Sequence, residues 1–242
     1  MKNFPVYLAL DLFTFFGPFI LSFDKKVAFF RSFRFLFPAI FITATFFIVW
    51  DIIFTKNGVW NFNPDYLCGI WFFNIPLEEV LFFVVVPYAS VFIYACLNAY
   101  FPQNKLLKYE LNINKFILFI LSIAITFAYG KAYTFYTSLF TLCLLLFLLS
   151  FRRPTWMANF WRAYLVHLIP FFLVNGVLTA LPVVIYNNQE NLSVRLYTIP
   201  VEDTIYSMLL LLMNISIMNE LEKRALNSSI NSKNHESNSL FK

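Results

Sequence analysis

The sequence predicts an all-α, polytopic membrane protein with about seven transmembrane helices. Its 242 residues are 60% hydrophobic and 21% aromatic, and only 13% are charged. A soluble domain is nearer half apolar and a quarter charged, so the composition excludes that class. Long apolar runs divided by short polar or basic connections give the number of helices, because a membrane-spanning helix needs about 20 mostly apolar residues.

Seven apolar runs are candidate spans. They cover roughly residues 4–23, 35–54, 76–100, 116–129, 131–151, 160–185 and 200–218. The first run has no strongly basic start and no cleavage site of small residues, so we interpret it as a span rather than a signal peptide. We expect residues 1–220 to form one integral membrane domain and residues 221–242 to form a polar, disordered tail.

The distribution of basic residues supports the short fourth span and predicts the orientation of the chain. With seven spans, 14 of the 18 Lys and Arg residues lie on one face, and only Lys2, Lys56, Lys131 and Arg195 lie on the other. The positive-inside rule then places the N-terminus outside and the C-terminus in the cytoplasm, in the cell (inner) membrane. The net charge of +5 says little about nucleic acid, because the basic residues sit in loops between spans. We expect the lipid bilayer, and no nucleic acid, as a partner.

Two stretches place a proline and two adjacent acids at the start of an apolar run. They are residues 74–79, with Pro76, Glu78 and Glu79, and residues 198–203, with Pro200, Glu202 and Asp203. Proline suits the first turn of a helix, and acids there are favoured by about 0.3–1 kcal/mol through the helix dipole. One interpretation is therefore structural: the proline and the acids only stabilise the N-termini of two helices. A functional site is the other, because ionisable groups at membrane depth usually mark function.

The two stretches belong to an internal repeat with an interval of 124 residues. At this interval Glu78 matches Glu202, Glu79 matches Asp203, Asp51 matches Asn175, and Phe82 matches Tyr206. The halves, about residues 1–100 and 127–220, each contain three spans, and one linker span separates them. Four spans separate equivalent helices, and this even number makes the halves parallel repeats. Both acidic motifs then lie on the same side of the membrane and can build one site.

Such a site suits acid catalysis. Burial and a neighbouring like charge both disfavour the ionised form of a carboxylic acid. Four acids in one pocket would therefore leave at least one protonated near neutral pH, able to protonate a weakly basic substrate. Aromatic faces, for which Phe82 and Tyr206 are candidates, can stabilise a cation. This combination suits protonation of an alkene in a lipid-soluble polyene and also proton-coupled transport, and spacing alone does not separate them.

The remaining motifs indicate no cofactor and no metal. The five glycines form no G-x-G pattern, so a dinucleotide fingerprint and a phosphate-binding loop are both absent from the sequence. The three cysteines lack metal-ligand spacing, and there are only two histidines. We expect His167 to be a hydrogen-bonded residue of the bundle rather than a catalyst.

Three segments resemble the signature segments of the membrane-embedded lycopene cyclases. These segments are Ile-Pro-Leu-Glu-Glu-Val-Leu-Phe-Phe at 75–83, Val-Asn-Gly-Val-Leu-Thr at 174–179 and Ile-Pro-Val-Glu-Asp-Thr-Ile-Tyr at 199–206. The family occurs as heterodimers or fused single chains in bacteria and archaea, and as the cyclase half of a bifunctional fungal enzyme. The resemblance covers essentially residues 1–220, and the doubled motif makes it fairly specific.

The resemblance implies an isomerase-type enzyme of carotenoid biosynthesis, which closes the linear ends of lycopene into β-rings to give γ-carotene and β-carotene. It implies no bound flavin and no net redox change. The catalytic acids would be Glu78, Glu79, Glu202 and Asp203, supported by Asp51 and Asn175. Lycopene, other linear carotenoids and neighbouring enzymes of the pathway are the implied partners. A carotenoid hydratase of the same bundle and a proton-coupled transporter or lipid-binding scaffold are the alternatives.

Overall fold

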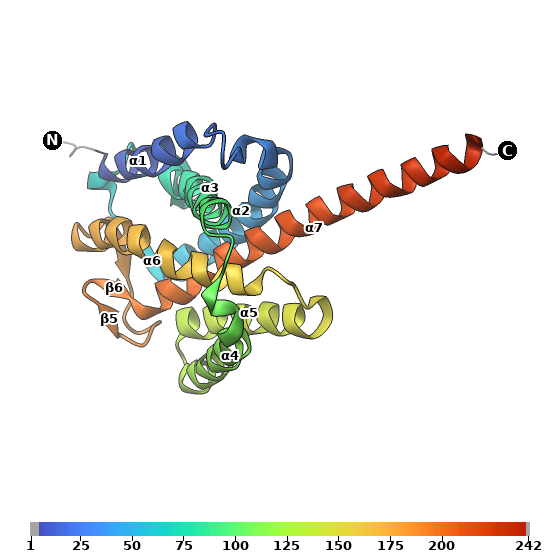
Figure 1. The fold of residues 1–242 in the computed structure, drawn as a ribbon. Coiled ribbons are helices and arrows are strands. Elements are labelled where there is room, and N and C mark those ends of the chain that lie inside the picture. The colour runs from blue at the N-terminus through green and yellow to red at the C-terminus, as the bar shows by residue number, and fades with distance from the viewer. Residues whose placement is uncertain (1–4, 241–242) are drawn as a thin grey trace.

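The protein forms seven α-helices in a computed structural model that describes residues 5–240, with side chains up to residue 230. The helices are α1 (Val6–Leu21), α2 (Phe33–Lys56), α3 (Leu77–Tyr100), α4 (Glu110–Phe127), α5 (Ala132–Phe147), α6 (Met157–Ala180) and α7 (Val201–Leu240) (Figure 1). Six helical segments of the described chain are long and apolar enough to cross a membrane, and α1 is a shorter apolar helix. The fold is therefore all-helical and fits a membrane protein.

Three small antiparallel ribbons, which the sequence analysis did not predict, lie in the connections. They pair β1 (Trp60–Phe62) with β4 (Val184–Tyr186), β2 (Trp71–Phe72) with β3 (Ile75–Pro76), and β5 (Arg195–Leu196) with β6 (Ile199–Pro200). The β1–β4 ribbon joins segments more than 120 positions apart, with Asn61 opposite Ile185. It therefore ties the connection after α2 to the connection after α6.

The elements recur at the 124-residue interval of the sequence. Helices α2 and α6 have 24 residues each and begin at residues 33 and 157, and α3 and α7 begin at residues 77 and 201. The three pairs of matching strands, β1 with β4, β2 with β5 and β3 with β6, keep the same interval. The backbone conformation is also repeated at this interval, because the equivalent residues Phe73 and Tyr197 both have positive φ angles, of 55° and 61°.

The helices pack so that equivalent pairs make equivalent contacts. Helix α1 packs on α3 and α5 packs on α7, while α2 packs on α7 and α6 packs on α3. Helix α4 packs mainly on α5, at the edge of the bundle (Figure 1). The buried apolar residues form two clusters, one of which contains Phe47, Trp50 and Phe83 close to the acidic helix starts. The acids are thus surrounded by helices on several sides.

Three helix boundaries differ most from the predicted spans. Helix α4 begins at Glu110, after a 3₁₀ turn, rather than near residue 116. Helix α6 ends at Ala180, because Pro182 lies just beyond it and cannot continue a helix. Helix α7 does not end near residue 218, and its continuation covers the segment 221–240 that we expected to be a disordered tail. Residues 220–226 are mostly strong helix formers, which favour this continuation.

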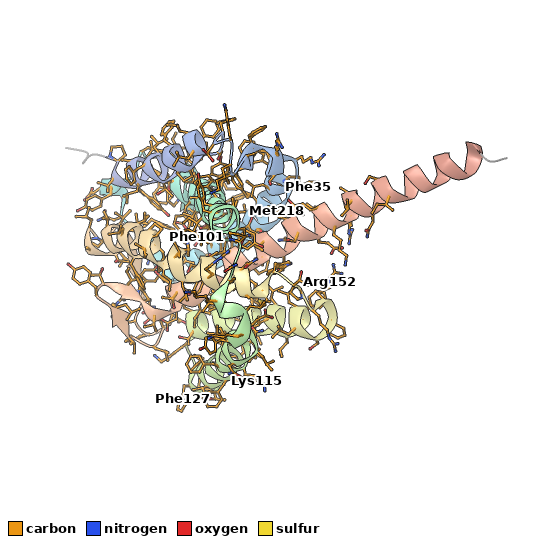
Figure 2. The ribbon with its side chains drawn as sticks, in the orientation of Figure 1. Phe35, Phe101, Lys115, Phe127, Arg152 and Met218 are labelled. Carbon is orange, nitrogen blue, oxygen red and sulfur yellow. The ribbon has the colours of Figure 1, made fainter. Side chains whose placement is uncertain are left out.

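The extension of α7 projects away from the bundle (Figure 1). Figure 2 shows Phe35 and Met218 near the point where α7 leaves the other helices, and both belong to one apolar cluster. Just beyond this point Glu220 forms ion pairs with Arg152 and Arg224. Basic residues and the exit of α7 therefore lie at the same end of the bundle.

Candidate functional site

Both acidic motifs lie where a small hairpin turns into a long helix. Pro76 and Pro200 are the last residues of β3 and β6, so each precedes its helix rather than standing inside the first turn as we predicted. Pro76 has an extended backbone (φ −73°, ψ 157°), which its fixed φ allows. The hairpins close on the helices through equivalent bonds, from Leu77 N–H to the Ile70 carbonyl (2.9 Å) and from Val201 N–H to the Val194 carbonyl (3.0 Å).

The first acid of each pair is turned toward its own connection. Glu78 is fully buried, and its Oε1 accepts a hydrogen bond of 2.6 Å from the Cys68 backbone N–H. Glu202 is equally buried, and its Oε1 accepts the equivalent bond from Leu192 N–H (2.7 Å) and another from the Thr134 hydroxyl (2.7 Å). These two carboxylates therefore fix the loops in front of the hairpins.

The second acid of each pair lines a shared cavity. Glu79 and Asp203 face a space of about 50 Å³ together with Asp51 and Asn175. The carboxylates of Asp51 and Asp203 each interact electrostatically with Glu79. The geometry thus brings three carboxylates and one amide from four different helices to one point in the bundle.

Tyrosines hold the two acids of the cavity, in a similar but unequal way. The hydroxyl of Tyr7 donates a bond of 2.6 Å to Glu79, and the hydroxyl of Tyr133 donates an equally short bond to Asp203. Asp203 receives a further bond of 2.9 Å from Tyr186, whereas the position equivalent to Tyr186 is Phe62. Burial, reinforced by the charge of Asp203, raises the pKa of Tyr186 well above its ordinary value. Tyr186 therefore keeps its proton and acts as a donor.

Aromatic and aliphatic side chains form the rest of the wall. They include Trp60, Phe62, Phe82, Val86, Phe171, Leu178, Val184, Tyr206 and Leu210. The Tyr206 hydroxyl and Asp51 Oδ2 are buried without a hydrogen-bond partner in the described chain, so they remain able to bind a ligand or water. The cavity therefore combines carboxylates, free polar atoms and ring faces, which suits general acid catalysis with stabilisation of a cation.

The structure brings together six of the residues that the sequence singled out, and it places four elsewhere. The six on the cavity are Asp51, Glu79, Phe82, Asn175, Asp203 and Tyr206. Of the others, Glu78 and Glu202 bind the loops, and Pro76 and Pro200 belong to the hairpins. Among the side chains that the structure describes, those of residues 5–230, no three His, Cys, Asp or Glu residues are grouped as ligands for a metal ion.

Sequence reasoning missed the three tyrosines that hold the acids. Tyr7 and Tyr133 are 126 positions apart, so an overlay of the first and fifth spans with a two-residue gap would have matched them. Tyr186 has no such signal, because its equivalent Phe62 lacks a hydroxyl group. Only the β1–β4 ribbon brings Tyr186 next to Asp203.

Comparison with known proteins identifies the family. The lycopene cyclase family matches residues 5–97 and 130–221, which is most of the chain. This chain belongs to the lycopene cyclase family. The two matched segments start 125 and end 124 positions apart, close to the repeat interval of the structure. The candidate site of this lycopene cyclase family member draws on both segments, with Glu79 from the first and Asp203 from the second.

Curated relatives share a shorter stretch. The bifunctional lycopene cyclase/phytoene synthases of Colletotrichum graminicola and Leptosphaeria maculans are 35% and 39% identical to this chain over 51 residues. The enzyme of the same name from Neurospora crassa is 35% identical over 49 residues. The first two alignments cover 21% of this chain and 9% of each relative, so they span about a tenth of the relatives' length. No solved structure matches the chain significantly.

Proposed function

We propose that this chain is an acid-catalysed lycopene cyclase that closes the linear ends of lycopene into β-rings, giving γ-carotene and β-carotene. The observation that carries the proposal is the convergence of Glu79, Asp203 and Asp51 on one buried, aromatic-walled cavity. Family membership supplies the substrate class, since the curated relatives are named for lycopene cyclisation. The membrane bundle supports it further, because such a substrate dissolves in the bilayer.

The reaction needs an acid at its start and a base at its end. A carboxylic acid gives its proton to the terminal alkene of lycopene and leaves a tertiary carbocation. The π electrons of a nearby double bond attack this cation, which forms the carbon–carbon bond of the ring and moves the positive charge into it. A carboxylate then removes a ring proton, and the electrons of that C–H bond become the ring double bond. One proton enters and one leaves, so the product is an isomer of the substrate.

Within this proposal we assign Glu79 as the proton donor and Asp203 as the carboxylate that faces the cation. Hydrogen bonds donated to a carboxylate favour its ionised form, and Asp203 receives two from tyrosines while Glu79 receives one. Asp51 also lies near Glu79, and a like charge favours protonation of one partner. Glu78 and Glu202 would then position the helix starts without touching the substrate.

The proposal also includes the arrangement of the bundle in the membrane. We infer two parallel three-helix repeats, α1–α3 and α5–α7, joined by α4 and related by a pseudo-two-fold axis through the cavity. The equal intervals and the symmetric β1–β4 register support this arrangement. The N-terminus and both ribbon-bearing connections would face away from the cytoplasm, which agrees with the excess of basic residues at the opposite ends of the helices.

Incubation of lycopene with membranes that contain the protein in deuterated water tests the function. A cyclase gives β-ring products of unchanged formula except for one deuterium per ring, because the first proton comes from solvent-exchanged acid and stays on carbon. Mass spectrometry of the pigments measures this incorporation of deuterium. Products heavier by one water would make the protein a hydratase. Unaltered lycopene, with folded protein present, would leave the transporter or scaffold interpretation.

A further inference from the structure

A narrow hollow runs from the acid cavity along α3, between α1 and α6. Its floor is one face of α3, from Phe82 through Val86 to Ile93, and its volume is about 40 Å³. The eleven steps of the helix from Phe82 to Ile93 cover about 16 Å, at about 1.5 Å per residue. The hollow shares Phe82, Val86, Phe171 and Asn175 with the acid cavity, so the two spaces adjoin. We call it the α1–α6 groove.

The repeat places a second hollow at the equivalent position, between α2 and α5. This α2–α5 groove is larger, about 770 Å³, but it shares no lining residue with the acid cavity. Trp50 stands between them, because its ring centroid lies 5.1 Å from that of Tyr206 on the cavity and 5.1 Å from that of Phe140 in the groove. The indole is buried and therefore closes this side.

The two grooves differ because equivalent positions carry side chains of different size. Trp50 corresponds to Val174 at the 124-residue interval. Phe140 on α5 corresponds to Thr14 on α1 at the interval of 126 that also matches Tyr133 with Tyr7. On the α2–α5 side, Trp50 and Phe140 pack with Phe46 in a connected group of rings, with centroids 5.1–5.8 Å apart. On the α1–α6 side, the smaller Val174 and Thr14 line the groove, which adjoins the acid cavity at Phe171 and Asn175.

We propose that the linear end of the carotenoid enters from the bilayer through the α1–α6 groove, with its polyene lying along α3, and that Val174 sets the width of this entrance. The proposal rests on the proposed function for the identity of the substrate. The direction of the groove along α3 and its largely apolar lining match the shape and polarity of a linear polyene. The flanks of the groove are lipid-facing, since Phe13 on α1 and Leu173 on α6 are 80% and 69% exposed.

The groove also contains one polar side chain with a free atom. His167 is buried, and its Nδ1 lies 3.0 Å from the Ser90 hydroxyl, which donates a bond of 2.6 Å to the Val86 carbonyl. His167 Nε2 has no hydrogen-bond partner among the residues that the structure describes. The expected role of His167 as a hydrogen-bonded bundle residue therefore agrees with its contacts, and the free nitrogen adds a polar point to the path of the polyene.

The test is the substitution Val174→Trp, with Leu173→Trp as the matched control. The tryptophan should close the α1–α6 groove as Trp50 closes the other one, and the equivalent position already accommodates this residue. Leu173 is the neighbouring residue on α6 and faces lipid, so the same substitution there leaves the groove open. Val174→Phe, which is less bulky, provides an intermediate case if the tryptophan variant does not reach the membrane.

Two measurements are compared between the variants. We expect Val174→Trp to lower ring formation about tenfold or more relative to Leu173→Trp, because the substrate end no longer reaches the acids. We also expect it to slow the modification of Glu79 by dicyclohexylcarbodiimide, an apolar reagent that reaches carboxylic acids through the bilayer, as followed by mass spectrometry. Membrane levels and melting temperature of the extracted protein establish that the variants are folded.

The proposal is overturned if either ring formation or labelling of Glu79 in Val174→Trp equals that in Leu173→Trp. Ring formation lost with normal labelling would mean that the substitution disturbs the chemistry rather than the passage. Slow labelling with normal ring formation would mean that the substrate uses another path. If the wild-type protein forms no rings, the proposed function fails, while the labelling comparison still shows where an apolar molecule enters.

Discussion

The two halves of the molecule share a backbone plan but differ at the places where chemistry would occur. Both begin a long helix with a buried acid that binds the backbone of the preceding loop, Glu78 in one half and Glu202 in the other. The next residues diverge in their surroundings, because Glu79 has one tyrosine donor and Asp203 has two. The repeat thus supplies the frame, and divergence from it gives the two acids unequal environments.

The same comparison applies to the access routes. Trp50 separates the α2–α5 groove from the acid cavity, whereas the α1–α6 groove, lined by the smaller Val174, adjoins the cavity. The larger of the two grooves is therefore not the one that adjoins the acid cavity. In the entry route that we propose, this difference between the halves gives a linear substrate a single direction of approach.

The largest expected effect comes from removing the acids that face the cavity. Glu79→Gln and Asp203→Asn should each lower ring formation on the order of a hundredfold, as is typical for loss of a general acid or base. The double variant should lose little more than either single variant, because both residues serve one cation. Pigment analysis in a lycopene-accumulating host, with membrane levels of the protein as control, measures this. Near-normal ring formation in both single variants would mean that these acids are not the catalytic residues.

The second prediction concerns the unequal number of tyrosine hydrogen bonds to the two acids of the cavity. Tyr186→Phe gives Asp203 the surroundings that Glu79 already has, since the residue equivalent to Tyr186 is Phe62. Loss of one hydrogen bond to a charged group, worth about 1.5 kcal/mol at the lower end of the usual range, should lower ring formation about tenfold. Tyr136→Phe is the control, because Tyr136 lies in the α2–α5 groove and not on the acid cavity. Equal activities of the two variants would mean that the second donor has no role.

A smaller effect is expected for the first acid of each pair. Glu78→Gln keeps an oxygen that can accept the bond from Cys68 N–H, and Glu202→Gln does the same for Leu192 N–H. Each should cost about 1 kcal/mol of stability and leave most of the ring formation. Thermal unfolding and pigment analysis of the same preparations measure both quantities. A loss as large as that of Glu79→Gln would return Glu78 to the catalytic set that the family resemblance implied.

The smallest effect on activity is expected from cysteines placed at equivalent exposed positions, which instead test the orientation. Asp65→Cys and Gln189→Cys lie 124 positions apart on the two ribbon-bearing connections and are both exposed. In a background without the three native cysteines, a membrane-impermeant thiol reagent added outside the cell should label both. Labelling of only one position would contradict the parallel repeat, and labelling of neither from outside would reverse the orientation.

The sequence by itself determined the class, the doubled motif and the interval between its copies. These are local or additive properties: composition and the length of apolar runs indicate a membrane bundle, and an ungapped repeat can be read by counting from Pro76 to Pro200. The same counting matched Asp51 with Asn175, and both residues line the cavity. Family resemblance rested on these same residues and is confirmed by the family match.

Only the tertiary structure decided which acid of each pair faces the cavity. Neighbouring residues on a helix point about 100° apart, so the direction of Glu78 and Glu79 depends on what packs around α3, and sequence adjacency cannot rank them. The packing of α1 and the β1–β4 ribbon brings Tyr7 and Tyr186 to the acids from distant parts of the chain. Trp50 and Val174 occupy equivalent positions and differ in size. The sequence does not show what this difference does, because only the folded helices place a groove beside each residue.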